Sequence, residues 1–145
     1  MNRPLWINST LVAIVGAALL PTGVAAAATD TARARCVPTR PGTGFYEAGR
    51  KASEPITASG CTTVSVSHIR DVRAPDDRCQ TFLLALLSTD GSDPTYTEPV
   101  RACSVPAARR TLLATDIPDG TVFRVLYDVD YIEPTQQVVE YAIWR

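Results

Sequence analysis

Four cysteines, Cys36, Cys61, Cys79 and Cys103, are the feature that most limits what this chain can fold into. All four follow an N-terminal segment with the composition of a secretory signal, and an even cysteine count in a short exported chain indicates disulfides. A zinc site is disfavoured because no Cys-x-x-Cys pair occurs and His68 is the only histidine. The sequence therefore predicts two disulfides in one small domain.

The favoured pairing joins the first cysteine to the second and the third to the fourth. Cys79 and Cys103 are equidistant from Gly91, the centre of a turn at residues 88–94. If the flanking segments form a hairpin, the two cysteines face each other within the roughly 5.5 Å Cα separation that a disulfide needs. The same argument allows Cys61 to pair with Cys79 around Arg70, so that alternative stays open.

Residues 1–28 have the three parts of a secretory signal peptide. Arg3 provides the positive start, residues 11–20 are apolar, and Pro21 precedes the small residues Ala25–Ala28. A membrane span needs roughly 20 apolar residues, more than this stretch contains. We expect cleavage near Ala28, or near Arg35 if residues 29–35 act as a pro-segment. The mature protein is then secreted, extracellular and without a membrane anchor.

Composition indicates one globular domain of about 117 residues after cleavage. The whole chain has a formal net charge of −1, and loss of Arg3 leaves 13 basic against 15 acidic residues, a charge of −2. No basic stripe favours nucleic acid. A single lysine, Lys51, beside many Arg, Ala, Asp, Thr, Val and Pro residues is typical of a high-GC bacterial genome. The oligomeric state is not predicted.

Patterning predicts an all-β fold, a small antiparallel β-sandwich of Greek-key or immunoglobulin-like type. Residues 29–60 are rich in Pro, Gly, Thr, Ser and Arg and are expected to form an extended N-terminal arm with short strand pieces. Residues 61–145 alternate short strands with turn residues and are expected to form the sandwich.

Individual strands follow from the two-residue period. Residues 62–68 alternate, which places Val64, Val66 and His68 on one face. The apolar run at 80–87 fits a buried strand or an amphipathic helix, and a strand is favoured because 96–103 can be its hairpin partner. Residues 110–115 are a further strand. Strands at 121–131 and 138–144 are expected to form a last hairpin, with these residues inward: Phe123, Val125, Tyr127, Val129, Tyr131, Val139, Tyr141 and Ile143.

No residue pattern indicates catalysis or a cofactor. Ser65 and His68 would lie on opposite faces of their strand, which disfavours a nucleophile–base pair. A speculative calcium site is Asp128, Asp130 and Glu133, whose carboxylates would gather at a sheet rim. The alternative is a solvated acidic face, partly neutralised by Arg124. We expect no enzyme, no cofactor and no obligatory metal.

From residue 61 to residue 120 the layout resembles the small exported bacterial α-amylase inhibitors of the tendamistat type. The segments that carry the resemblance are Cys61–Val64, Ser67–Arg70, Asp77–Thr81 and Arg101–Cys103. It implies a two-disulfide sandwich and an inhibitor-like role. The family's inhibitory Trp-Arg-Tyr turn is reduced to one arginine here, and its last cysteine has no counterpart, so no inhibitory residue is transferred.

The leading functional hypothesis is a non-enzymatic extracellular binding protein, or an inhibitor of an extracellular enzyme. Its binding loops would be 69–77 and 88–94, because rigid scaffolds tend to place binding on loops. The candidate binding residues are Ile69, Arg70, Asp71, Asp90 and Asp93.

Two other functions are weaker expectations. A carbohydrate- or envelope-binding module would need exposed aromatic side chains, and the candidates are Phe45, Tyr46, Tyr96 and Trp144. A small secreted hydrolase is the least favoured. The expected partner is an extracellular protein or a glycan.

Overall fold

A computed structural model describes residues 36–132 and 134–145, and the predicted signal peptide and residues 29–35 lie outside this part. All regular elements in it are strands. They are β1 (Pro38–Thr39), β2 (Thr43–Tyr46), β3 (Arg50–Ser53), β4 (Ile56–Thr57), β5 (Val64–Asp71), β6 (Cys79–Leu87), β7 (Thr95–Tyr96), β8 (Val100–Cys103), β9 (Thr111–Ala114), β10 (Val122–Asp128) and β11 (Val139–Trp144). No helix long and apolar enough to cross a membrane occurs in these residues.

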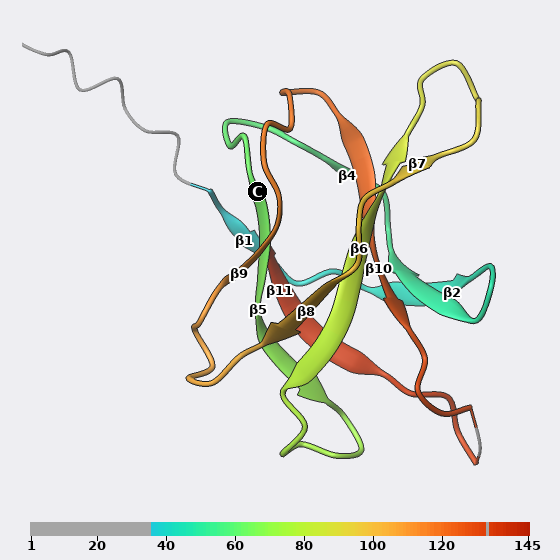
Figure 1. The fold of residues 1–145 in the computed structure, drawn as a ribbon, viewed down its shortest axis with the longest axis vertical. Helices are drawn as coiled ribbons and strands as arrows, with labels where there is room; N and C mark the ends of the chain where they lie inside the picture. Colours follow the sequence, from blue (N-terminus) through green and yellow to red (C-terminus); the bar gives the residue numbers. More distant parts are fainter. Residues whose placement is uncertain (1–35, 133) are drawn as a thin grey trace, which may run out of the picture. The chain divides into compact units, whose positions relative to one another are not determined.

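The strands form two antiparallel sheets that pack together (Figure 1). One has the order β1-β11-β5-β9, and the other has the order β2-β3-β10-β6-β7, with β4 beside β10 and β8 beside β6. The predicted all-β sandwich with two disulfides is therefore confirmed.

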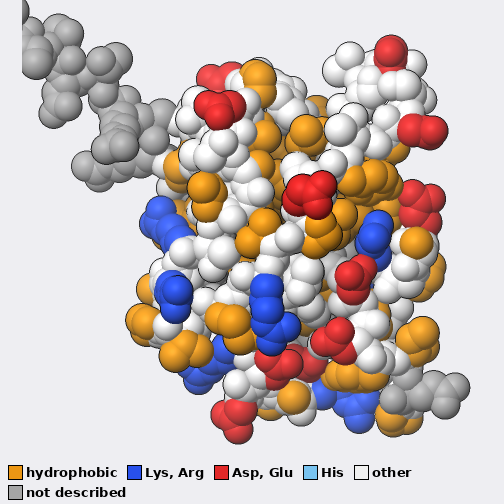
Figure 2. All heavy atoms as spheres, in the orientation of Figure 1, with side chains coloured by type: hydrophobic (Ala, Val, Ile, Leu, Met, Phe, Trp, Pro, Cys, Tyr) orange, Lys and Arg blue, Asp and Glu red, His pale blue; other side chains and the backbone are white. Residues whose placement is uncertain are grey.

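The core lies between the sheets and follows the two-residue period of the strands. Three of its aromatic rings pack together: Phe82 lies 4.9 Å from Tyr141 and 6.0 Å from Tyr127, centroid to centroid. The inward faces predicted for β10 and β11 hold for Phe123, Val125, Tyr127, Val139, Tyr141 and Ile143, all of which are buried. A smaller apolar cluster on the outer face of the larger sheet contains Ala52, Leu83, Ala85 and Leu126. Figure 2 shows apolar side chains on the upper part of one face, near β6 and β7.

The segment 80–87 is a strand, as favoured, and its hairpin brings the third and fourth cysteines together. Cys79 pairs with Cys103 in the ladder between β6 and β8, and Ala85 pairs with Tyr96 of β7. Cys79 and Cys103 form a disulfide in which their Cα atoms are 4.1 Å apart. The second disulfide is Cys36–Cys61, with Cα atoms 5.2 Å apart, so the favoured pairing is confirmed.

The expected hairpin of the last two strands is wrong. β10 pairs with β3, β4 and β6 in one sheet, whereas β11 pairs with β1 and β5 in the other. Each of the two strands buries one face. Alternating apolar residues are buried equally well whether two strands pair as a hairpin in one sheet or face each other across the core from two sheets. The rings of Tyr127 and Tyr141 meet in this way, 6.1 Å apart. The strand at 121–131 is also shorter than expected, because β10 ends at Asp128.

Residues 36–60 belong to the sandwich instead of preceding it as an arm. β1 pairs with β11, and β2, β3 and β4 extend the larger sheet. The segment has the short strand pieces that its composition predicts, and its apolar residues Ala52, Ile56 and Ala58 are buried. Its prolines limit strand length without excluding strand pairing.

Candidate functional site

The two expected binding loops lie at opposite ends of the structure, so they do not form one surface. Ile69, Arg70 and Asp71 belong to the end of β5 and not to a loop. Asp90 and Asp93 follow the far end of β6, a nine-residue strand that spans roughly 30 Å (Figure 1). Asp90 accepts hydrogen bonds from Ser88 Oγ and the Ser92 N–H, and these bonds lower its pKa to about 2.

Asp71 has a structural role. Its buried carboxylate accepts bonds from the backbone N–H groups of Arg73 and Ala74, at 2.7 and 3.2 Å. Tyr131 Oη and Gln137 Nε2 also donate to it, at 3.2 and 2.9 Å. Burial disfavours its ionisation, but the bond from Gln137 and those from the other donors outweigh that effect and hold the Asp71 pKa below 3.8. Asp71 therefore joins β5 to the loops at 72–78 and 129–138, and its oxygens are not available to a ligand.

In the part of the chain that the structure describes, the calcium candidates do not come together as a metal site. Asp128 is 3.0 Å from Arg50 Nε in an ion pair. Asp130 lies beyond the end of β10, and Glu133 lies outside the described residues. Within 36–132 and 134–145, no three His, Cys, Asp or Glu side chains are grouped as metal ligands.

The four candidate aromatic residues are divided between the two sheets. Phe45, Tyr46 and Tyr96 belong to the larger sheet, where Phe45 is 71% exposed and the hydroxyls of Tyr46 and Tyr96 are 3.4 Å apart. Tyr96 Oη also donates to Glu47, at 3.0 Å. Trp144 belongs to β11 of the smaller sheet, and the Arg110 guanidinium covers its ring at 3.3 Å. These side chains therefore do not form one flat platform.

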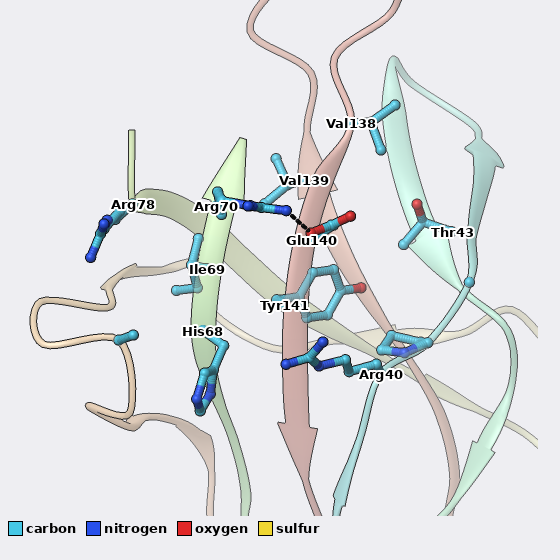
Figure 3. Close-up of a pocket in the computed structure, with 13 residues that line it drawn as sticks. Arg40, Thr43, His68, Ile69, Arg70, Arg78, Val138, Val139, Glu140 and Tyr141 are labelled. Atoms are coloured by element: carbon cyan, nitrogen blue, oxygen red, sulfur yellow. Dashed lines mark hydrogen bonds and ion pairs between the residues drawn. The ribbon is translucent and has the colours of Figure 1, made fainter. Parts of the chain in front are cut away.

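A groove of about 670 Å³ crosses β5 and β11. Five segments line it, and its residues are Arg40, Pro41, Gly42, Thr43, His68, Ile69, Arg70, Arg78, Ala107, Val138, Val139, Glu140 and Tyr141. In Figure 3, β5 and β11 run side by side through the site, with Arg78 and His68 toward one side and Thr43 and Val138 toward the other.

The groove is basic although the chain as a whole is slightly acidic. It contains three guanidinium groups, those of Arg40, Arg70 and Arg78, and one carboxylate, that of Glu140. Arg70 Nη2 donates to Glu140 Oε2 at 2.6 Å, which leaves two arginines without an acidic neighbour among the lining residues. Figure 3 shows the side chain of Arg40 crossing β11, with its guanidinium group directed toward the side on which His68 lies. The site therefore favours a negatively charged ligand.

A β-bulge presents His68 to this groove. His68 and Ile69 together lie opposite Tyr141, because the register shifts between Glu140 and Ala142. His68 has a φ of 54°, a left-handed conformation that is costly for a residue of this size. The extra residue turns Ile69 into the core in place of His68, so the expected inward position of His68 is wrong. Bulges that redirect a side chain are common beside functional sites.

Hydrogen bonds fix the imidazole in place. Trp144 Nε1 donates to Ser67 Oγ at 2.8 Å, and Ser67 Oγ lies 2.8 Å from His68 Nδ1. Since Trp144 is the donor, the Ser67 hydroxyl can donate to Nδ1 and leave Nε2 free for a ligand. The sequence pattern indicates Ser65 and not Ser67 as the serine to consider, because strict alternation places the adjacent residues Ser67 and His68 on opposite faces and only the bulge brings them together. Ser67 is wholly buried, so its hydroxyl cannot reach a substrate.

No family model, no curated protein and no solved structure matches this chain.

Proposed function

We propose that this chain is a secreted bacterial protein that binds an acidic partner protein in the extracellular medium, without catalysing a reaction. The observation that carries the proposal is the groove, which three arginines and a redirected histidine line together with a single carboxylate. Inhibition of an extracellular enzyme is one form such binding would take. The buried position of Ser67 supports binding over hydrolysis.

Export itself gives the first test. Two disulfides are typical of extracellular proteins, and the N-terminal segment has the composition of a signal peptide. We expect the protein to be released into the culture medium with an N-terminus near Thr29 and no free thiol. N-terminal sequencing and thiol titration of the released protein provide the measurement. A full-length cytoplasmic protein with four reduced cysteines would contradict the proposal.

The groove gives the second test. Arg40→Ala combined with Arg78→Ala removes the two guanidinium groups that have no acidic neighbour in the groove. We expect the double variant to bind poly-L-glutamate at least fivefold more weakly at low ionic strength, because two favourable charge contacts are lost. Binding by the native protein should also weaken as salt is added, since screening is strong beyond about 8 Å at 0.15 M. Titration calorimetry measures both effects.

The matched control is Arg101→Ala, which removes an exposed arginine from β8 on the other sheet. It lowers the net charge by one unit without touching the groove, so its affinity should stay within twofold of the native value. The same three proteins serve as baits for culture fluid. A protein retained by native and Arg101→Ala baits, and lost by the double variant, supports the groove as the binding site. Equal retention by all three rejects it.

A further inference from the structure

One edge of β11 has no neighbouring strand along part of its length. β1 pairs only Pro38 with Trp144 and Thr39 with Ile143, and then the chain crosses to β2 in the other sheet. Pro41 has no N–H group and cannot continue the ladder. Within 36–132 and 134–145, no strand covers this edge of β11 beyond Thr39, and the groove lies against it.

The contacts with β1 show which backbone groups of β11 are directed outward at this edge. Val37 and Arg145 exchange two backbone hydrogen bonds, at 2.8 and 3.3 Å, so Arg145 directs its N–H and C=O toward β1. Alternate residues of an antiparallel strand point the same way, which assigns this direction to Tyr141 and Val139 as well. The N–H of Val139 donates to the hydroxyl oxygen of Tyr127 at 3.2 Å. The C=O of Val139 and both backbone groups of Tyr141 therefore face the groove.

We propose that the partner docks here as an extended acidic segment that adds a strand to β11 beside Val139–Tyr141. Strand addition obtains affinity from backbone hydrogen bonds and specificity from alternate side chains. The proposal rests on the groove being the binding site, and it adds the conformation and composition of the ligand.

Charge complementarity selects an acidic segment. Side chains of an added strand alternate between its two faces, so every second one would lie on the face of Arg70 and Glu140. Arg40 and His68 line the same groove, and the one carboxylate there is already paired with Arg70. The structure therefore favours a segment with Glu or Asp at alternate positions and uncharged residues between them. Five such residues span about 16 Å.

The probe is a blocked peptide, acetyl-Glu-Val-Glu-Val-Glu-amide, with two N-methylated versions. One version is methylated on the glutamate nitrogens and the other on the valine nitrogens. In an added strand only one of these two sets of N–H groups faces β11, so one version should lose at least tenfold in affinity and the other should lose little. In the complex, hydrogen exchange at the Tyr141 amide should slow at least tenfold.

Two substitutions at Gly42 test the location. A Cβ at Gly42 meets no atom within 4 Å, and the same is true of Gly44, which lies on β2 outside the groove. Gly42→Glu should weaken peptide binding at least fivefold and Gly42→Lys should strengthen it. Gly44→Glu adds the same charge away from the site and should change affinity by less than twofold.

The possible failures are distinguishable. If both methylated peptides bind like the parent while the Arg40/Arg78 double variant still binds poly-L-glutamate weakly, strand addition is rejected and the basic groove stands. If the double variant binds poly-L-glutamate like the native protein, both proposals are rejected. Tighter binding of an anionic glycan than of any peptide would also reject an extended peptide as the occupant.

Discussion

Replacing Asp71 by alanine is expected to lower the free energy of unfolding by about 3 kcal/mol or more. The substitution leaves four donors without their acceptor: the N–H groups of Arg73 and Ala74, the hydroxyl of Tyr131 and the amide of Gln137. A hydrogen bond to a charged group contributes about 1.5–3 kcal/mol, and Gln137, like Asp71, is buried. Urea denaturation at neutral pH measures the loss.

The lowered pKa of Asp71 also makes the stability of the protein dependent on pH. Its pKa in the folded protein lies below the ordinary value of 3.8, so between these two values the unfolded chain binds more protons. Its contribution is therefore complete above pH 3.8 and is lost as the pH falls through the folded-state pKa. Stability should decrease on acidification in that window.

The matched control is Asp71→Asn, which keeps one acceptor oxygen and removes the titration. It should destabilise less than alanine does, and its stability should fall less steeply between pH 4 and pH 2. Asp90, whose pKa is lowered to about 2, is present in both proteins and cancels in the comparison. Identical pH profiles for the native and Asp71→Asn proteins would show that this carboxylate does not stabilise the fold.

Local patterning predicts which residues are buried better than it predicts which strands pair. The alternation in β10 and β11 identifies their inward residues because it depends only on each strand's own pleat. Pairing depends on the connection, and residues 129–138 carry the chain from one sheet to the other instead of turning it back. A hairpin and a face-to-face arrangement bury the same side chains, so the pattern cannot separate them.

The bulge at His68 has no signal in the sequence. A left-handed bulge position usually holds glycine, which would have marked the break in alternation after Val66. A histidine in that place looks like one more residue of a regular strand. Cysteine spacing was more informative, because Cys79 and Cys103 are equidistant from a recognisable turn and the β6–β8 ladder places them opposite each other.

The groove could not be predicted because it is formed by parts of the chain that are distant in sequence. Arg40 comes from the segment expected to be an arm, and Arg78 and Ala107 come from separate loops. Only Ile69 and Arg70 of the five predicted binding residues line it. A basic site assembled from single arginines also leaves no charged run in a chain whose net charge is −1.

Removing either disulfide should destabilise the fold by a similar amount. Cys36–Cys61 and Cys79–Cys103 close loops with sequence separations of 25 and 24 residues. Through loop-closure entropy each disulfide is expected to contribute about 3.5 kcal/mol to the free energy of unfolding. Paired cysteine-to-alanine variants should therefore show nearly equal losses in urea denaturation. A difference of more than about 2 kcal/mol would indicate that the two bonds do not act mainly through loop closure.

The two variants should differ in binding, because the disulfides hold different parts of the groove. Beyond Cys79–Cys103, three further ladder pairs still join β6 to β8. By contrast, the segment that ends at Arg40 is held by the two-residue ladder of β1 and by the backbone bonds of its neighbour Val37. The variant without Cys36–Cys61 should therefore bind the acidic peptide at least fivefold more weakly. The variant without Cys79–Cys103 should stay within twofold of the native protein. Calorimetry at a temperature where both variants are folded makes the comparison, and equal affinities would show that the tether at Cys36 does not position Arg40.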